Sequence, residues 1–598
     1  MPVFGIDLGT TYSAIATLDD NGQPKLIQNL VEGSFILPSV VYFEDGATPC
    51  VGKEAKSNAE VYPDRVIQFV KRDIGKPNGR TINFDGKMED PISISAYILK
   101  RLAEYSKEQD YDVKDVVITV PAYFGIEERN ATRQAGEMAG FNVLGIVNEP
   151  TAAAINYCYG QQGNQKILVY DLGGGTFDVS IIEMITNDDG TIKIDIIDSD
   201  GNDRLGGMDW DKRLADFVLN EYAQQENISV DDIKPEMMHR IKTSAEGAKI
   251  ALSTTINRNV TIPSNSEEGR MVKINVTREI FNDLTRDLVN RTMSYLNLLL
   301  QRNSMTPDDI STVLLVGGST MMHIIMETVE SMFKNSRVIR HDPNLAVAKG
   351  AALYAKINAE KAVEEILRER KKNPQPGPGP DPDNTNKTEP PIPPLSEDTM
   401  REIEQELQSG TSSVSNIEVS DILSCSVGVL INRRMGDGDY YNAIDNFLSY
   451  GDKSPAEEIN KYIAPSDGGI YATFYQNKLK ITEDDKIKIT KKETRSDQHY
   501  IKLEKTDEDY KVLETLIPDP NFVVKEIGAL EFVDSAIKRG DDVIVKIEFS
   551  TSGLWAYVTH VKTDRTEKCE LKSETGKSAA EIEEGAARIA QKGTASGV

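Results

Sequence analysis

The sequence is poor in cysteine and has no long hydrophobic run. Its four cysteines, Cys50, Cys158, Cys425 and Cys569, lie far apart and form no CxxC pair, so neither a disulfide framework nor a zinc site is indicated. No stretch approaches the roughly 20 consecutive apolar residues that a transmembrane helix needs. An apolar run begins at Val3 and leaves no space for the charged and apolar regions of a signal peptide. We therefore expect a cytoplasmic protein.

Positive charge is scarce relative to negative charge. The chain has 68 Lys and Arg residues against 95 Asp and Glu residues, a formal net charge of −27. Because such an excess of carboxylates repels phosphate backbones and anionic lipids, we expect neither nucleic acid nor a membrane as partner. The 598 residues, 39% of them hydrophobic, have the composition of a soluble globular protein with room for about three to five folding units.

The first part of the chain alternates strand and helix patterns. The apolar run Val116–Val120, for example, is followed by a helical pattern, and such alternation continues over residues 1–357. This alternation of strand and helix patterns predicts an α/β architecture. Residues 358–415 then combine a charged helix pattern, a Pro-rich linker with nine prolines between Pro374 and Pro394, and a short amphipathic helix.

The C-terminal part changes to period-two alternation. One predicted strand face carries the apolar side chains of Val543, Val545, Ile547 and Phe549. Short alternating runs of this kind, separated by turn residues, predict an antiparallel β module over residues 416–572. Beyond it, we expect residues 573–598 to form a flexible tail with one weak helix.

Two similar glycine-containing turns follow apolar strand patterns. The first reads Gly5-Ile6-Asp7-Leu8-Gly9-Thr10-Thr11-Tyr12, and the second reads Asp171-Leu172-Gly173-Gly174-Gly175-Thr176. Glycines let the backbone approach an anion, amides and Thr hydroxyls surround phosphate oxygens, and an Asp that ends a strand suits Mg²⁺. Either turn alone is equally well a tight turn whose Asp accepts bonds from backbone amides. Two copies at the same place in a strand pair predict an internally duplicated nucleotide-binding fold.

Four further motifs occur in a specific order. They are Lys71-Arg72-Asp73-Ile74-Gly75, Val120-Pro121-Ala122-Tyr123-Phe124, Val147-Asn148-Glu149-Pro150-Thr151 and Leu315-Val316-Gly317-Gly318-Ser319-Thr320. With the two turns, this order resembles the DnaK-like seventy-kilodalton heat-shock chaperones, the heat shock protein 70 family, over residues 1 to about 356. The resemblance implies an actin-like ATPase fold with two duplicated ribonuclease-H-like lobes, which binds ATP or ADP with Mg²⁺ and hydrolyses ATP.

The resemblance also implies roles for individual residues. Asp7 and Asp171 would hold Mg²⁺, and the catalytic set would be Lys71, Glu149, Asp171 and Thr176. The phosphates would contact Gly9, Thr10, Thr11, Tyr12, Gly173, Gly174, Gly175 and Thr176. The nucleoside would contact Glu246, Lys249, Ile250, Ser253, Gly317, Gly318, Ser319 and Met321. Without the flanking motifs, Lys71 is an ordinary solvated cation and Glu149 a residue at a helix boundary.

The predicted base-binding end departs from the family pattern. Ile250 and Met321 stand where the family usually stacks two Arg side chains on adenine, and Asn344 replaces a family Asp. Apolar side chains still bury a purine, but the cation–π attraction is lost. We therefore expect weaker nucleotide affinity or a relaxed base preference. Pro121 and Arg129 match a family relay between nucleotide and the next domain, although a loop Pro and a surface Arg explain them as well.

The C-terminal module resembles the family's β-sandwich peptide-binding domain more faintly. The resemblance rests on four runs, Asp421–Val429, Gly469–Gln476, Lys525–Leu530 and Val543–Leu571. An unrelated β domain that serves as a spacer or docking surface is the alternative. The apolar linker of the family is diluted with polar residues at 416–420, residues 480–518 form a charged insertion, and too few residues follow Leu571 for the helical lid. A bound peptide should therefore leave quickly.

Three functions follow from these observations. The first is an ATP-dependent chaperone that binds unfolded or extended polypeptides, with a J-domain co-chaperone and a nucleotide exchange factor as possible partners implied by the resemblance. The second is a nucleotide-sensing adaptor with low ATPase activity and one dedicated protein partner, which the long tether and the loss of both Arg residues favour. The third is a sugar kinase on the same superfold, disfavoured because no sugar-binding motif is evident.

Overall fold

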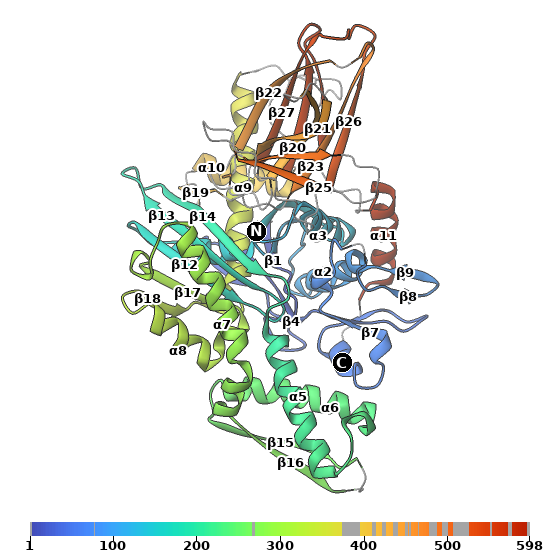
Figure 1. Ribbon diagram of the computed structural model, residues 1–598, viewed down its shortest axis with the longest axis vertical. Coiled ribbons are helices and arrows are strands. Elements are labelled where there is room, and N and C mark those ends of the chain that lie inside the picture. Colours follow the sequence, from blue (N-terminus) through green and yellow to red (C-terminus); the bar gives the residue numbers. More distant parts are fainter. Residues whose placement is uncertain are drawn as a thin grey trace.

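The computed structural model describes most of the chain (Figure 1). The described residues are 3–76, 78–265, 269–372, 395–409, 414, 416–420, 426–434, 440–448, 452–453, 456–464, 466–477, 487–492, 500–505, 525–550, 553–571 and 577–594. The predicted Pro-rich linker lies outside these residues. No helix within the described ranges is long and apolar enough to cross a bilayer.

The first half of residues 1–357, here called lobe I, is built on a mixed sheet. Its strand order is β11-β10-β1-β2-β3, with β1 parallel to β10 and antiparallel to β2. The strands are β1 (Val3–Asp7), β2 (Tyr12–Leu18), β3 (Pro24–Leu26), β10 (Asp115–Val120) and β11 (Asn142–Asn148). Helices α2 (Pro91–Lys107) and α3 (Ile126–Met138) pack beside one another and share a core with this sheet.

A second sheet, the centre of lobe II, repeats this topology. Its order is β18-β17-β12-β13-β14, with β12 parallel to β17 and antiparallel to β13. The strands are β12 (Gln165–Leu172), β13 (Phe177–Thr186), β14 (Ile192–Asn202), β17 (Thr312–Val316) and β18 (Arg337–Arg340). Because strand order and direction agree, the internal duplication that the two glycine turns predict is present in the fold.

Two helices lie between the lobes and depend on small residues. They are α4 (Glu149–Cys158) and α9 (Ala346–Lys372), which pack on one another. A Cβ at Gly5 of β1 would overlap the backbone of α9 at Ala352, and one at Gly350 of α9 would overlap the carbonyl of Ala152 in α4. Glycine at these two positions therefore lets strand and helices approach closely enough to form one continuous apolar core.

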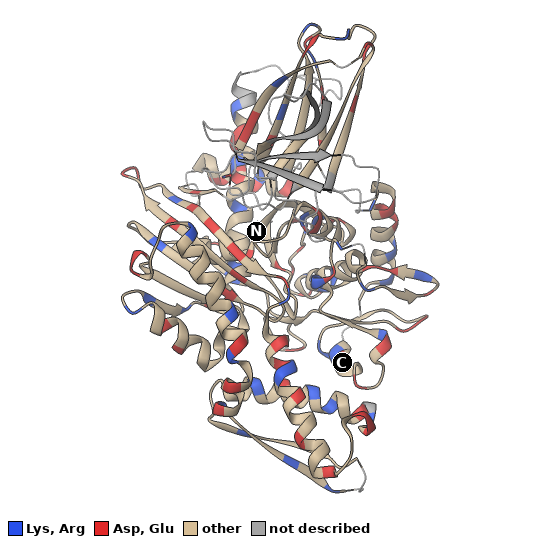
Figure 2. Cartoon of the chain, in the orientation of Figure 1, with Lys and Arg blue, Asp and Glu red and all other residues tan. Residues whose placement is uncertain are grey.

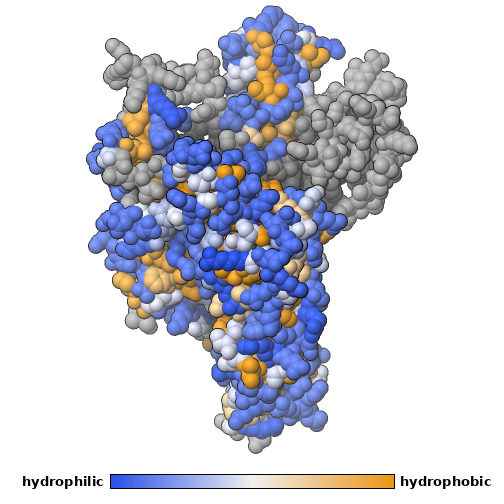
Figure 3. Space-filling model, turned by 90° about the vertical axis from the view of Figure 1, so that its left-hand side faces the viewer, coloured by the Kyte–Doolittle hydropathy of each residue, from blue (hydrophilic) through white to orange (hydrophobic). Residues whose placement is uncertain are grey.

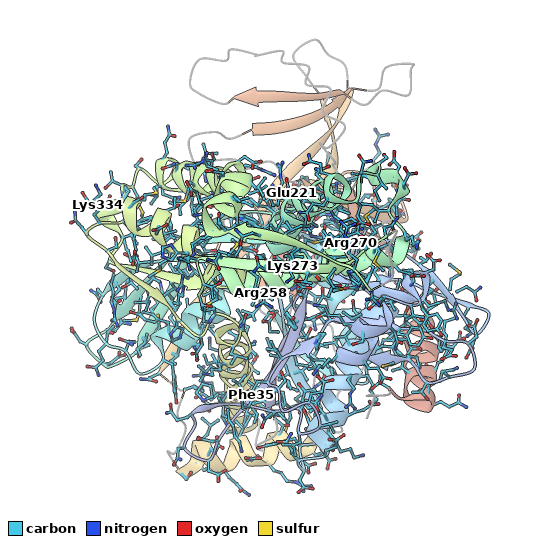
Figure 4. All side chains as sticks on the ribbon, turned by 90° about the horizontal axis from the view of Figure 1, so that it is seen from below. Phe35, Glu221, Arg258, Arg270, Lys273 and Lys334 are labelled. Carbon is cyan, nitrogen blue, oxygen red and sulfur yellow. The ribbon has the colours of Figure 1, made fainter. Side chains whose placement is uncertain are left out.

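Smaller elements extend both lobes away from the sheets. Lobe I adds β4 (Leu37–Pro38), β5 (Val40–Tyr42), β6 (Cys50–Val51), α1 (Lys53–Asn58), β7 (Val66–Gln68), β8 (Ile82–Phe84) and β9 (Lys87–Glu89). Lobe II adds α5 (Gly207–Glu226), α6 (Pro235–Leu252), β15 (Asn257–Pro263), β16 (Met271–Thr277), α7 (Arg278–Arg302) and α8 (His323–Met332). Seen from below, Arg258, Arg270 and Lys273 lie on or beside hairpin β15–β16 (Figure 4).

The C-terminal module contains two antiparallel sheets with one shared core. The first has the order β25-β24-β21-β20-β23-β26, and the second the order β22-β27-β28-β29. The strands are β20 (Ser426–Arg434), β21 (Tyr440–Leu448), β22 (Ala456–Ile463), β23 (Gly469–Asn477), β24 (Ile487–Lys492), β25 (Tyr500–Lys505), β26 (Lys525–Val533), β27 (Asp542–Ser550), β28 (Gly553–His560) and β29 (Arg565–Glu570). The charged stretch 480–518 thus contributes the hairpin β24–β25, and its remaining residues lie outside the described ones.

Three segments that flank this module pack on the lobes. Helix α10 (Glu397–Ser409) packs on α9, and strand β19 (Ile417–Ser420) pairs in parallel with β14. Helix α11 (Ala579–Lys592) lies against α2 and α3 (Figure 1). This docking differs from the flexible tail expected from residue 573, because Ile582 and Ile589 of α11 pack into the core of lobe I.

Candidate functional site

A large cavity lies between the two lobes and collects most of the residues predicted to bind nucleotide. Its volume is about 1420 Å³, and both lobes contribute to its walls. The predicted residues that line it are Asp7, Gly9, Thr10, Thr11, Tyr12, Glu149, Asp171, Gly173, Gly174, Thr176, Glu246, Lys249, Ile250, Ser253, Gly317, Gly318, Ser319 and Met321. Residues far apart in sequence are therefore brought to one cleft. Gly175 and Lys71 lie outside the lining.

The two glycine turns face one another across this cleft. A Cβ at Gly174 would overlap the hydroxyl of Thr11, and one at Gly175 would overlap the side chain of Thr10. The second turn is closed by the Gly173 amide, which donates to the Thr176 carbonyl at 3.0 Å. Glycine is needed here because any side chain would separate the two turns. The predicted phosphate-binding arrangement of paired turns is thus geometrically available.

Buried carboxylates gather where the turns meet their strands. Asp7 is the last residue of β1, and Asp171 lies at the end of β12. Burial, with the nearby Glu149 carboxylate as second cause, raises the pKa of Asp7 to about 7. Burial and then Glu149 also raise the pKa values of Asp171 and Asp178 well above their usual range. The raised values reflect uncompensated negative charge in low dielectric.

This carboxylate cluster fits a hard divalent cation. Asp7 and Asp171 supply oxygen ligands at the ends of two equivalent strands, and Mg²⁺ usually takes one or two carboxylates and keeps several waters. A bound cation would offset the repulsion that raises both pKa values. Within the described part of the chain, no group of three or more His, Cys, Asp or Glu side chains is arranged as a metal site. Asp7 and Asp171 offer carboxylate oxygens, the donors that Mg²⁺ prefers, and not the Cys or His donors on which zinc sites mostly depend.

Lys71 is the cation that faces these carboxylates. It lies in the short turn Val70–Arg72, is 3% exposed, and donates a hydrogen bond to Glu149, the first residue of α4. The positive charge of Lys71 lowers the pKa values of Asp7 and Asp171 and so opposes the effect of burial. Lys71 is therefore not an ordinary solvated cation, and its charge acts on Asp7 and Asp171, which line the cleft.

Arg72, the neighbour of Lys71, was not among the predicted site residues. Its guanidinium donates to the carbonyl of Gly175 at 2.9 Å and to Asp209 at 3.0 Å, so it holds the second glycine turn from the opposite lobe. The fixed fork of Arg suits this pair of acceptors. The Lys-Arg pair in the sequence was the only signal that could have suggested this role.

The predicted nucleoside end is organised by ion pairs on α6. Glu246 pairs with Lys56 of lobe I at 2.9 Å, and Lys249 pairs with Asp211 of α5 at 2.8 Å. The first pair joins α1 of lobe I to α6 of lobe II across the cleft, and residues of both charges lie along α5 and α6 (Figure 2). Lys56 and Asp211 are further lining residues that sequence reasoning missed, since nothing near them forms a motif.

Two apolar side chains stand at the mouth of this end. Ile250 is 58% exposed and Met321 is 39% exposed, and both line the cavity.

Gly317 has a φ of +83°, and a Cβ there would overlap the carbonyl of Leu172, which explains the glycine. Ser319 donates to the carbonyl of Gly173 at 2.8 Å and so supports the second phosphate turn.

The two predicted relay residues occupy different places. The amide of Ala122, next to Pro121, donates to Asp178 at 2.9 Å, which links this loop to the carboxylate cluster. Arg129 of α3 donates to the carbonyl of Phe124 at 3.1 Å and to Asn148, the residue before Glu149. Neither residue lines the cavity; Pro121 is next to the residue that bonds Asp178, and Arg129 bonds the residue that precedes Glu149.

Comparison with known proteins identifies a family that agrees with the motifs and the two-lobed cleft. A family model described as Hsp70 protein matches residues 3–369. The chain belongs to the Hsp70 family. It is 40% identical over 362 residues to a protein named Chaperone protein DnaK from Thermosipho melanesiensis, and 40% identical over 363 residues to proteins of that name from Thermotoga neapolitana and Thermotoga maritima.

These matches have a defined extent. Each covers 60% of this chain and 59% of the relative. The matched family region ends within α9, before the Pro-rich linker. The resemblance to the heat shock protein 70 family is confirmed, and the two duplicated lobes of this Hsp70-family chain fit the actin-like ATPase fold.

Proposed function

We propose that this Hsp70-family chain hydrolyses ATP in the cleft between its lobes. The proposal rests on one observation, the two glycine turns that face one another with Asp7, Asp171 and Lys71 beside them. Amides of both turns and the hydroxyls of Thr10, Thr11 and Thr176 would bind the phosphates. Bound Mg²⁺, held by Asp7 and Asp171, would supply charge neutralisation at the phosphate oxygens.

The residues of this chain would then orient water and protect the site. Lys71, whose ammonium is fixed by Glu149, would direct the attacking water and stabilise negative charge that develops on the terminal phosphate. Arg72 and the Lys56–Glu246 pair join the lobes across the cleft and so would exclude bulk water. Positioning and electrostatics account for most of phosphoryl-transfer catalysis, and both depend on lobe closure.

The ATPase proposal is tested by Lys71→Ala, with Lys107→Ala as control because Lys107 is an exposed lysine at the end of α2. Single-turnover hydrolysis of labelled ATP should fall by about 10²- to 10⁴-fold in Lys71→Ala and stay unchanged in the control. If wild type hydrolyses ATP and Lys71→Ala hydrolyses it equally fast, the assignment of Lys71 is wrong.

We also propose that residues 416–572 form a β-sandwich that binds extended polypeptide, with residues 1–357 as the ATPase domain and 358–415 as the connection. Two sheets with a shared core support a sandwich. Exposed apolar side chains on its strands offer contact surface, namely those of Ile459, Ile463, Tyr471 and Val533. On the face that Figure 3 shows, hydrophobic residues gather on this module at the top of the view. The proposal includes a J-domain co-chaperone and a nucleotide exchange factor as partners of this chain.

A second candidate is the nucleotide-sensing adaptor with slow ATP turnover and one partner. The apolar residues Ile250 and Met321 at the nucleoside end favour it. Membership of the Hsp70 family disfavours the sugar kinase. Dissociation of a fluorescent peptide of apolar, extended sequence, measured with and without ATP, distinguishes the first two. Faster release with ATP supports the chaperone, and absence of peptide binding together with slow turnover supports the adaptor.

A further inference from the structure

Helix α10 buries one face against the ATPase lobes. Thr399 and Ile403 are fully buried, and Met400 and Leu407 pack partly buried against the same core. Leu395 before the helix and Val414 after it are buried in that core as well. The helix is therefore docked along its whole length, although it follows the Pro-rich stretch and lies beyond the region that the family model matches.

The first turn of α10 is bonded to lobe I. Asp115, a buried residue that begins β10, accepts a hydrogen bond from the Ser396 hydroxyl at 2.6 Å and another from the Thr399 hydroxyl. It also accepts from the Ser396 amide at 3.3 Å and from the Asn142 side chain at 2.6 Å. Three of these four donors come from the α10 segment. Removing the helix would leave a buried carboxylate largely unsatisfied, which is costly.

The second half of α10 is bonded to the helix between the lobes. Lys356 of α9 is 2% exposed and pairs with Glu406 of α10, and Glu360 lies 3.7 Å from the same ammonium. A buried pair of this kind holds geometry firmly, because separating its partners leaves an uncompensated charge.

The described residues that follow α10 contact lobe II. The Val414 carbonyl accepts from the Ile417 amide at 3.0 Å, and the Asn416 carbonyl accepts from the Ile192 amide of β14 at 2.7 Å. β19 then pairs with β14 from Ile417 to Ser420. One short segment therefore joins lobe I, through Asp115, to the edge strand of lobe II.

β19 itself makes few contacts that would hold it on lobe II. It is four residues long, with only Ile417 and Val419 buried and Glu418 exposed. Its polar contact is the Ser420 hydroxyl, which donates to Asp195 of β14 at 2.7 Å. A strand this short at a sheet edge is marginal without further packing.

We propose that α10 is an intramolecular clasp that keeps β19 docked on lobe II. The buried face of α10 supplies the apolar area that the polar linker 416–420 lacks. The linker therefore stays docked with and without nucleotide. This inference goes beyond the proposed ATPase and stands whether or not ATP is hydrolysed.

The test is hydrogen exchange of the β19 amides in the full chain, without nucleotide and with Mg²⁺ and ADP. Wild type should protect Ile417–Ser420 in both conditions. Ile403→Ala, which removes buried side-chain atoms from α10, should accelerate their exchange by at least about tenfold in both. The matched control is Gln405→Ala on the exposed face of α10, which should exchange like wild type.

A milder variant covers the case in which Ile403→Ala disturbs folding. Thr399→Val keeps the side-chain shape and removes one hydrogen bond to Asp115, so β19 should exchange faster while the central strands β12 and β13 keep their protection. The clasp is refuted if β19 exchange is unchanged in both α10 variants. It is equally refuted if wild-type β19 loses protection whenever nucleotide is absent.

Discussion

Lys71 donates a hydrogen bond to Glu149 between the lobes, and this ammonium opposes the repulsion among several buried carboxylates. The two partners are therefore not equivalent. Removing Glu149 takes away one of the negative charges that raise the pKa values of Asp7 and Asp171. Removing Lys71 leaves those negative charges with less compensation.

We accordingly predict that Lys71→Met destabilises the nucleotide-free protein more than Glu149→Gln does. The free energy of unfolding should fall by about 3–5 kcal/mol in Lys71→Met, as for a broken buried ion pair. It should fall by less in Glu149→Gln. Thermal unfolding of the lobes followed by tryptophan fluorescence measures the difference, since Trp210 is buried in lobe II. Equal losses in the two variants would contradict this account of the cluster.

The raised pKa of Asp7 predicts a pH-dependent stability. Its ordinary value is 3.8 and its folded value is about 7. Because the folded state binds this proton more tightly than the unfolded state, the stabilisation is fully present below about pH 3.8 and is lost as pH rises through 7. Asp7→Asn, which cannot ionise, should therefore gain stability over wild type as pH rises from about 4 to about 7, with a constant difference above that.

The measurement is the melting temperature without nucleotide or Mg²⁺ at several pH values, with Asp20→Asn as control because Asp20 is exposed. The control should follow wild type throughout. If the difference in melting temperature between Asp7→Asn and wild type does not change with pH, Asp7 ionises normally. The same Asn variant should lose the stabilisation that Mg²⁺ and ADP give to wild type.

The apolar mouth of the nucleoside end predicts a gain of affinity on restoring positive charge. Ile250→Arg should strengthen ATP binding by about 0.5–2 kcal/mol, roughly 2- to 30-fold, because a guanidinium placed over a purine face adds cation–π attraction. Isothermal titration with ATP and GTP measures both affinity and base preference. Ile256→Arg is the matched control, since Ile256 is 71% exposed and lies outside the cavity lining. An equal gain of ATP affinity in Ile256→Arg would mean that the added positive charge alone, and not its contact with the purine, strengthens binding.

Some of the molecule was predictable from sequence and some was not, for physical reasons. The turns at Asp7 and Asp171 are local motifs, and their equal place in two strand pairs was enough to predict the duplicated lobes. The Lys56–Glu246 pair joins residues 190 positions apart through solvent-facing helices, and no local pattern marks it. The docking of α11 depends on complementary surfaces formed only after folding. The short helix at Met400, Ile403 and Leu407 was predictable as amphipathic, but its partner surface was not.

The C-terminal helix gives a last prediction, based on two ion pairs in one interface. Arg588 of α11 pairs with Glu89 of hairpin β8–β9, whose carboxylate is fully buried, whereas Lys87 and Glu584 pair with both side chains more than half exposed. Removing Arg588 leaves a buried charge unpaired, while an exposed pair contributes little.

Arg588→Met should therefore release α11 from lobe I, and Lys87→Met should not. Limited proteolysis with a protease that cleaves after Glu checks this, because a released α11 is cut after Glu581, Glu583 or Glu584, which every variant retains, while the folded lobes resist. The double variant Arg588→Met with Glu89→Gln should recover much of the docking, since the neutral amide no longer leaves a buried charge. If Lys87→Met exposes α11 as readily as Arg588→Met does, the helix is held by general charge attraction, and the buried pair has no special role.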